Sequence, residues 1–311
     1  MALHRMLDIE IGVADPATLD AFYQEIGFVG GDGLWGAADQ PGQIRIVEAP
    51  YRQLRKVRLG CEDEADLDAT AKRLEGLGVK YQKGGGRLQL VDPHNEWEFI
   101  IEPAPAYVQP EQPKRTQNFP GVRGRVGKRA EVITEPTPRP PRRLGHIVVG
   151  SPKPLETTQL MTEGLGYRVS DSLGGGLATF LRCSPDHHNL LVTPGQVPYL
   201  NHYAVEHDDF DAVMRAATVY LTEHGDERQV AGPGRHQIGG NIFWYMLDPS
   251  GTFFEYFADM DQIIDDEAWE IRADWNPAES WSVWGQKQQP EVFFAPQDMQ
   301  VIVDGWHKAH R

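Results

Sequence analysis

The chain contains a weak internal repeat, and this repeat limits its possible folds more than any other feature. Residues 12–16 match residues 150–154, and the Asp-Pro pair at 92–93 matches the pair at 248–249. The spacing between these motifs is wider in the second copy, which indicates extra loops there. A duplicated chain of 311 residues is expected to form two domains of about 100 to 150 residues rather than one compact core.

Each copy shows the same order of expected elements. A strand is followed by a helix and further strands, and this order occurs twice per copy, as judged from apolar periodicity and from the Pro and Gly residues that begin and end helices. Each half is therefore expected to contain two βαβββ units, an α+β architecture. The clearest expected strands are residues 7–13, 88–91, 147–150 and 242–247, and the expected helices are residues 16–27, 67–77, 154–166 and 210–221.

The segment between the copies differs in composition from both. Residues 109–143 contain seven prolines, with nine basic and three acidic residues. Such a segment is typical of a solvated linker. The alternative is that its arginines pack on the acidic remainder of the chain or on a neighbouring subunit.

The last fifty residues contain several large apolar side chains. Trp269, Trp275, Trp281 and Trp284 lie in this tail, and leaving so much apolar surface in water is unfavourable. The tail is therefore expected to dock on a domain or at an interface. The predicted division is an N-terminal domain at 1–105, a linker at 106–142, a C-terminal domain at 143–261 and the tail at 262–311.

Charge and cysteine content exclude several classes of function. With 30 basic and 45 acidic residues, the formal net charge is −15, which disfavours nucleic acid and anionic membranes as partners. The first residues carry Asp8 and Glu10 where a signal peptide would be apolar, so a cytoplasmic location is expected. Cys61 and Cys183 are the only cysteines and form no CxxC motif, so His and carboxylate side chains would have to hold any metal.

Three potential metal ligands lie on three separate expected strands of the second half. They are His146, His202 and Glu255. Side chains on strands are stiff and can converge inside a curved sheet. Two imidazoles and one carboxylate leave open positions on an octahedral ion, as in nonhaem Fe(II) oxygenases.

With these residues, the second half resembles the type I extradiol, ring-cleaving dioxygenases of the vicinal oxygen chelate superfamily in their two-domain form. The resemblance also rests on the His187-His188 pair, the Gly-Pro-Gly-Arg-His motif at 232–236 and Tyr245. It is dense from residue 146 to 261 and only topological from 1 to 105. The implied fold is glyoxalase-like, with paired βαβββ modules forming an incomplete curved barrel in each domain.

The resemblance implies that His146, His202 and Glu255 hold Fe(II), with Mn(II) as the other ion that suits such ligands. The implied reaction opens the ring of a catechol-type substrate with O2, in aromatic catabolism. The product would be of the 2-hydroxymuconic-semialdehyde type. The expected partners are this substrate and O2, and a homo-oligomer is expected because such assemblies are usual in the family.

The resemblance also implies catalytic roles for three further residues. His188 would take a substrate proton, and its ordinary pKa of about 6.5 lies near neutral pH. Tyr245 would hydrogen-bond the bound substrate oxygen, and His236 would support the same edge of the ring. If His187 and His188 lie on a strand, only one can point inward, and His188 is the preferred candidate.

Two other functions remain open on the sequence alone. One is a related isomerase or epimerase of the glyoxalase type that uses Zn(II), Ni(II) or Co(II), and such an enzyme does not need His188, His236 and Tyr245. The other is a nonenzymatic small-molecule-binding protein of the same fold, which is not expected to retain three ligands. For the substrate, Ala231 stands where relatives acting on carboxylated catechols can carry Arg, which weakens the expectation of a charged substituent. The apolar residues near the motifs would suit a neutral alkyl or aryl catechol.

The first half lacks the candidate ligands. Under the repeat, Asp8 corresponds to His146 and Phe99 to Glu255, and no His lies near Leu59. A second metal site is therefore not expected, and residues 1–105 are interpreted as structural. The remaining histidines His94, His207 and His224 are expected at the surface.

Overall fold

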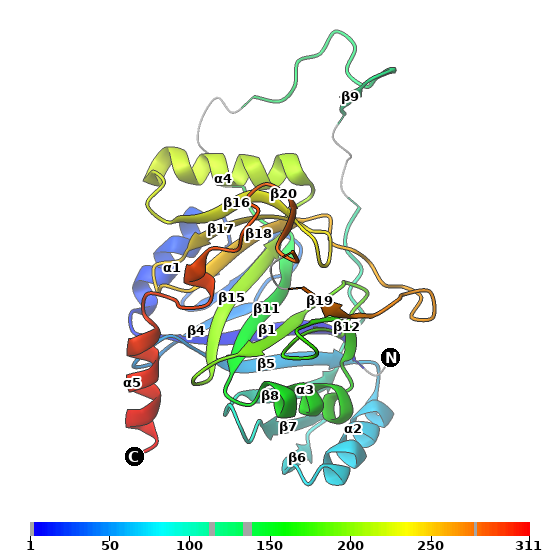
Figure 1. Ribbon diagram of the computed structural model, residues 1–311, viewed down its shortest axis with the longest axis vertical. Helices are drawn as coiled ribbons and strands as arrows, with labels where there is room; N and C mark the ends of the chain where they lie inside the picture. Colours follow the sequence, from blue (N-terminus) through cyan, green and yellow to red (C-terminus); the bar gives the residue numbers. More distant parts are fainter. Residues whose placement is uncertain (1–2, 112–115, 133–138, 277–278) are drawn as a thin grey trace.

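The structure, a computed structural model, describes residues 3–111, 116–132, 139–276 and 279–311 (Figure 1). The two predicted βαβββ units are present in the first half. The first unit is β1 (Leu3–Val13), α1 (Pro16–Glu25), β2 (Val29–Gly31), β3 (Leu34–Gly36) and β4 (Ile44–Glu48). The second is β5 (Gln53–Cys61), α2 (Glu64–Gly76), β6 (Tyr81–Gly84), β7 (Arg87–Val91) and β8 (Glu98–Pro103).

The second half repeats this order. Its first unit is β11 (Arg143–Ser151), α3 (Pro154–Gln159), η1 (Leu160–Leu165), β12 (Arg168–Leu173), β13 (Ala178–Arg182) and β14 (Leu190–Pro194). Its second unit is β15 (Tyr199–Glu206), α4 (Phe210–His224), β16 (Gln229–His236), β17 (Ile242–Leu247) and β18 (Phe253–Ala258). The helix predicted at 154–166 differs in its second part, because Leu160–Leu165 winds as a π-helix and ends at Gly166 with φ of 90°.

The two halves build two sheets with the same strand order. The first is β2-β3-β4-β1-β5-β8-β7-β6, and β1 and β5 lie antiparallel at its centre. In the second sheet β11 and β15 take these central places, and β14 and β18 run parallel beside them. Each sheet therefore consists of two similar units joined at their first strands, which confirms the predicted α+β fold.

The two sheets share one apolar core, although the length of the chain predicts two. A single buried cluster contains Ile9 and Phe22 from the first half and Ile147, Tyr203 and Phe254 from the second. The ring of Phe22 lies 5.6 Å from that of Phe254 in an edge-on contact. The two copies therefore pack against each other through one apolar interior.

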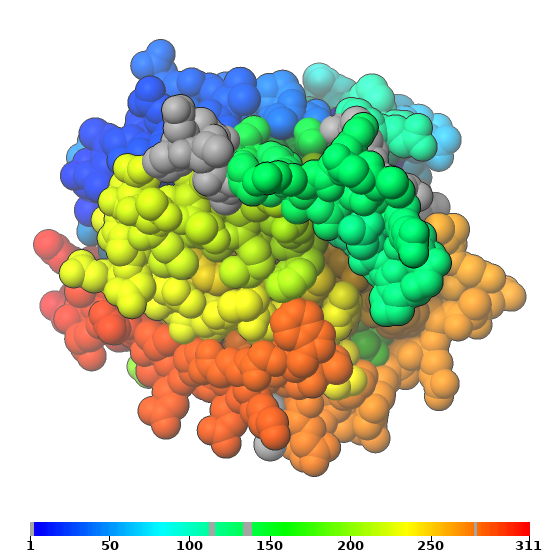
Figure 2. Space-filling view, turned by 90° about the horizontal axis from the view of Figure 1, so that it is seen from above, coloured from blue at the N-terminus to red at the C-terminus, as the bar shows by residue number. Residues whose placement is uncertain are grey.

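The tail adds strands to both edges of the second sheet. β19 (Arg272–Trp275) runs parallel to β12, and β20 (Ser282–Trp284) pairs with β16. The chain then forms η2 (Glu291–Phe293) and α5 (Met299–Ala309), whose Ile302 is fully buried against Tyr51 and Tyr199. Figure 2 shows the tail, in orange to red, along one margin of the molecule beside α4.

The linker leaves the body as an extended arm (Figure 1). Its described part carries a short hairpin of β9 (Asn118–Phe119) and β10 (Val122–Arg123), and both strands are exposed. Residues 112–115 and 133–138 of the predicted linker lie outside the described residues. In the parts that the structure describes, no helix is long and apolar enough to cross a membrane.

Candidate metal centre and active site

The candidate ligands lie on the face of the second sheet that is turned away from the shared core. Successive side chains of a strand point to opposite faces. Ile147, Tyr203 and Phe254 belong to the shared core, so their neighbours His146, His202 and Glu255 point the other way. The three strands β11, β15 and β18 are adjacent in the sheet, which brings the three side chains together.

These three side chains form a compact, buried cluster. Their ligand atoms all lie within 4.8 Å of one another. Nε2 of His146 lies 3.0 Å from Oε2 of Glu255, and Nε2 of His202 lies 3.5 Å from the same oxygen. Glu255 is fully buried. Burial would raise the pKa of this carboxyl group, but the two imidazoles outweigh this effect and hold the pKa below its ordinary value.

The surrounding amides orient this cluster. The side-chain oxygen of Asn201 accepts a hydrogen bond of 2.9 Å from Nδ1 of His202, so Nε2 of His202 carries the lone pair. Nδ2 of Asn201 donates to the carbonyl of Phe293 in the tail. On the other side, Nδ2 of Asn241 donates to Oε1 of Glu255 over 3.0 Å. Such outer contacts fix the tautomer and the direction of metal ligands.

The cluster fits a divalent cation. Nε2 of His202 is buried and has no hydrogen-bond partner among the described residues, which is unfavourable unless a ligand or ion satisfies it. Two ligands at right angles on an ion, each about 2.1 Å away, lie about 3 Å apart. The separations of 3.0 and 3.5 Å match this spacing. His146, His202 and Glu255 could therefore hold one cation together.

The His187-His188 pair lies in a loop between β13 and β14 and not on a strand. Both rings are buried, and they lie one behind the other, with their Nδ1 atoms 3.1 Å apart. The pair therefore does not alternate as on a strand, but only His188 of the two lines the cavity, as preferred from the sequence. His188 lines the cavity, 4.4 Å from the ring of His146, whereas His187 lies behind it. Burial, and then the neighbouring imidazoles, lower the pKa of His188 well below its ordinary value, so His188 is neutral near neutral pH.

A second pair, His236 and Tyr245, lies on β16 and β17. Nδ1 of His236 donates to the carbonyl of Trp281 over 2.9 Å, so its Nε2 accepts from the Tyr245 hydroxyl over 3.0 Å. Burial lowers the pKa of His236 to about 4, although Glu255 and the Trp281 carbonyl act in the opposite direction. Burial raises the pKa of Tyr245 well above 10. Both groups are therefore neutral near neutral pH.

These residues open into one cavity of about 340 Å³. Its wall is mostly apolar, and the tail contributes part of it. Within the described residues, no Lys, Arg, Asp or Glu side chain lines this cavity. The residues that line it are His146, Val148, Leu173, Gly174, Leu177, Ala178, Phe180, His188, Leu191, Thr193, Pro194, Tyr199, Asn201, His202, His236, Ile238, Tyr245, Ser280, Trp281, Gln289, Phe293 and Phe294.

No protein-family model matches the chain, but two curated dioxygenases are similar to it in sequence. The chain is 29% identical over 265 residues to metapyrocatechase 2 of Cupriavidus necator, covering 83% of this chain and 79% of that relative. It is 27% identical over 249 residues to a manganese-dependent 2,3-dihydroxybiphenyl 1,2-dioxygenase of Geobacillus genomosp. 3, covering 75% and 72%.

Two solved structures show which fold the chain has. The Mn(II)-bound glyoxalase from Novosphingobium aromaticivorans superposes with a TM-score of 0.72 at 25% identity, covering 94% of each chain. Homoprotocatechuate 2,3-dioxygenase from Brevibacterium fuscum superposes with a TM-score of 0.73 at 17% identity, covering 95% of this chain and 92% of that one. The chain has the vicinal oxygen chelate fold. The resemblance to extradiol dioxygenases, inferred from the motifs of the second half, is confirmed.

The first copy of the vicinal oxygen chelate fold has ion pairs where the second has its ligand cluster. Strand pairing gives the counterparts as Asp8 for His146, Lys56 for His202 and Ile100 for Glu255, so the predicted counterpart Phe99 is wrong by one residue. Arg58 lies 2.6 Å from Asp8, and Lys56 lies 3.1 Å from Glu98. Side-chain cations thus neutralise the carboxylates there. Among the described residues, only the second half brings together three such ligands.

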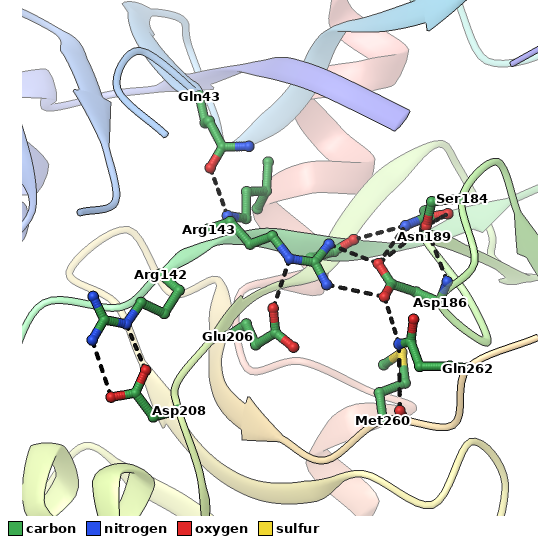
Figure 3. A network of polar contacts seen from close by, with 12 residues as sticks. Gln43, Arg142, Arg143, Ser184, Asp186, Asn189, Glu206, Asp208, Met260 and Gln262 are labelled. Atoms are coloured by element: carbon green, nitrogen blue, oxygen red, sulfur yellow. Dashed lines mark hydrogen bonds and ion pairs between the residues drawn. The ribbon is translucent and has the colours of Figure 1, made fainter. Parts of the chain in front are cut away.

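An ion network around the buried Asp186 holds the loop that carries His188 (Figure 3). Arg143 at the start of β11 lies 2.7 Å from Asp186 and 2.6 Å from Glu206. Asp186 also accepts from Ser184 over 3.0 Å and from Gln262 over 2.8 Å. Burial would raise the pKa of Asp186, but Arg143 outweighs this and holds it below its ordinary value. Because Asp186 directly precedes the two histidines, this network positions them.

Replacing Arg143 by methionine is expected to lower the free energy of unfolding by about 3 to 5 kcal/mol, because the buried Asp186 and the partly buried Glu206 would lose their partner. Urea denaturation followed by circular dichroism measures this change. Arg139→Met is the matched control, because Arg139 pairs with the half-exposed Glu131 and such pairs contribute less than about 1 kcal/mol. Equal losses in the two variants would contradict the structural role of the network.

The depressed pKa of Asp186 adds a pH dependence. Its contribution to stability is present above the ordinary carboxyl pKa and is lost as the pH falls through the lower folded-state value. The stabilising effect of Arg143 should therefore persist at neutral pH and disappear in acid.

Several residues of the site were not found from the sequence. Asn201 and Asn241 hydrogen-bond to the candidate ligands His202 and Glu255, and Trp281 and Phe293 bring the tail to the cavity. The Asn next to His202 was a usable signal, since an adjacent amide can fix an imidazole tautomer. His207 was expected at the surface but is buried, with its ring 4.7 Å from that of Tyr256.

Proposed function

We propose that this chain is an Fe(II)-dependent extradiol dioxygenase that opens the ring of a catechol-type substrate with O2. One observation carries the proposal: His146 and His202 of the ligand cluster line the same cavity as His188 and the Tyr245–His236 pair. A metal site alone would suit many reactions. A metal site beside a neutral buried imidazole and a phenol suits the deprotonation and orientation of a vicinal diol.

Different residues of the site would bind, orient and deprotonate the substrate. When bound, the cation would hold the two substrate oxygens, make their hydroxyl groups more acidic and bring O2 to the same centre. His188 is neutral and lines the cavity, so it can accept a substrate proton and later return it. Tyr245 donates to His236, so its oxygen can accept a hydrogen bond from a substrate hydroxyl. The apolar wall excludes water, which strengthens these contacts.

The cavity also supports a substrate class. Because no Lys, Arg, Asp or Glu lines the cavity in the part of the chain that the structure describes, a charged substituent would be buried without a partner, which is unfavourable. A neutral alkyl or aryl substituent would instead contact Leu191, Phe180 and Trp281. The position before the Gly-Pro-Gly-Arg-His motif is Ala231, which is buried and apolar. We therefore assign the chain to catechols with uncharged substituents.

The test is anaerobic reconstitution with Fe(II) or Mn(II), followed by oxygen uptake and absorbance measurements with a panel of catechols. We expect oxygen consumption and a yellow ring-opened product. For 3-methylcatechol and 2,3-dihydroxybiphenyl, kcat/KM should exceed that for 3,4-dihydroxyphenylacetate by about 10-fold or more. A preference for the carboxylated substrate would contradict the assigned substrate class.

A glyoxalase-type isomerase is the second candidate, favoured by the similarity to the Mn(II)-bound glyoxalase. Such a reaction consumes no oxygen. Incubation of the Mn(II)- or Ni(II)-loaded protein with the hemithioacetal of methylglyoxal and glutathione tests it directly. Isomerisation without any oxygen uptake on catechols would replace the dioxygenase proposal.

Three finer predictions belong to the same proposal. Fe(II) is the proposed ion, because the two-His, one-carboxylate set with open positions suits oxygen chemistry, and the two reconstitution arms distinguish it from Mn(II). O2 is the proposed second substrate. A homo-oligomer remains the expected assembly, and sedimentation of the purified protein measures it.

A further inference from the structure

A buried chain of hydrogen bonds runs from the C-terminal tail to the cavity. It begins at the backbone N–H of Arg272 on β19, which donates to Oδ1 of Asp171 on β12 over 2.7 Å. Oδ2 of Asp171 lies 3.1 Å from Nε2 of His187. Nδ1 of His187 lies 3.1 Å from Nδ1 of His188, and His188 lines the cavity.

The chemistry of these groups allows only one arrangement of protons when both rings are neutral. A carboxylate can only accept hydrogen bonds, so Nε2 of His187 carries the proton and donates to Asp171. Nδ1 of His187 is then bare and accepts from Nδ1–H of His188. The remaining nitrogen of His188, Nε2, keeps its lone pair.

The surrounding residues shield this series of hydrogen bonds from water and restrict its movement. Asp171 and His187 are almost fully buried. The ring of Phe180 lies 5.6 Å from His187 and 5.2 Å from His188. Backbone packs over the junction as well, since a Cβ at Gly239 would lie 3.1 Å from Nδ1 of His187. Water has little access to compete for these hydrogen bonds.

We infer that Asp171 and His187 are positioning residues that fix the tautomer of His188, so that its Nε2 faces the cavity as a ready proton acceptor. This inference rests on the proposed function for its catalytic meaning, because the base is needed only if a substrate proton is removed. The tautomer of His188 depends only on residues of this protein, so it can be measured without turnover.

The C-terminal tail also contacts Asp171 and His187. β19 pairs in parallel with β12 and sets Arg272 opposite Asp171. Trp269 donates from its indole nitrogen to the carbonyl of Ser170 over 2.9 Å, and its ring lies 5.5 Å from that of His187. The Trp-rich tail thus fixes the carboxylate that begins the chain of hydrogen bonds.

The substitution Asp171→Asn gives a sharp prediction. The N–H of Arg272 would hold the amide oxygen, so the amide NH2 group would face Nε2 of His187. That nitrogen would then have to accept, which moves the His187 proton to Nδ1 and makes Nδ1 of His188 the acceptor. Both tautomers should invert, and Nε2 of His188 should carry the proton.

The experiment is long-range 1H–15N correlation NMR of the full chain, labelled with 15N and measured both metal-free and loaded with diamagnetic Zn(II). His188 is assigned by the loss of its signals in a His188→Phe variant. In the wild type, Nδ1 of His188 should be the protonated nitrogen and Nε2 the bare one. In Asp171→Asn the two should exchange, and kcat of the Fe(II) enzyme with 3-methylcatechol should fall by about 10²-fold or more. KM and iron content should change less than about twofold.

Asp274→Asn is the matched control, because Asp274 lies on β19 but contacts the side chain of Arg272 and not Asp171. It should leave both tautomers and kcat unchanged. A wild-type His188 protonated at Nε2 would overturn the inference even if Asp171→Asn fails to fold, and so would unchanged tautomers in a folded Asp171→Asn. Correct tautomers in a wild type that consumes no oxygen with any catechol would overturn the proposed function and leave the positioning role intact.

Discussion

Replacing Glu255 by glutamine is expected to remove the bound cation and to lower turnover by at least about 10³-fold. Glu255 supplies the only negative charge of the ligand cluster and is fully buried between two imidazoles. Loss of an outer contact to a metal ligand already weakens metal affinity by about 10- to 100-fold, and loss of the anionic ligand itself should cost more. Elemental analysis after anaerobic reconstitution and dialysis measures the iron content.

Glu267→Gln provides the control for this experiment, because Glu267 is an exposed carboxylate of the tail. It should retain about one iron per chain and full turnover. If Glu255→Gln also retained its iron, the cation would have to bind elsewhere, and the proposed centre would be wrong.

Replacing His188 by phenylalanine should lower turnover by about 10² to 10⁴-fold and leave the iron content unchanged. The ring of His188 lines the cavity next to His146 but does not belong to the ligand cluster. Phenylalanine fills a similar volume and cannot accept a proton. Steady-state oxygen uptake and elemental analysis of the same preparation separate the two effects.

His307→Phe on the exposed face of α5 serves as the comparison variant. It should match the wild type in both measurements. Unchanged turnover in His188→Phe would remove His188 from the mechanism, whereas loss of iron would show that it acts through the metal site.

The fold could be predicted from the sequence because its signals are local. Proline at 16 and 154 begins a helix in each copy, and alternating or continuous apolar residues mark the central strands. The shared core could not be predicted. Phe22 and Phe254 are 232 positions apart, and nothing local indicates that their rings meet. The π-helix at Leu160–Leu165 was missed for a related reason, since its apolar pattern also fits an α-helix.

The candidate site shows the same division. His146, His202 and Glu255 were placed on three expected strands whose side chains can converge in a curved sheet, and the structure brings them together. The His187-His188 loop follows no periodicity, because distant partners such as Arg143 and Asp261 hold it in place. From the sequence alone, His188 is expected to have the ordinary pKa of histidine. Burial beside other imidazoles instead lowers the pKa of His188 well below that value.

Because the two copies share one core, the two faces of the first sheet tolerate substitutions differently. Substitutions at Asp8, the counterpart of His146, would alter only the outer face of the first sheet. Mutations at Ile9 or Phe22 would instead expose the back of the catalytic sheet. Natural selection can therefore relax over one surface of the first copy while still constraining the opposite one.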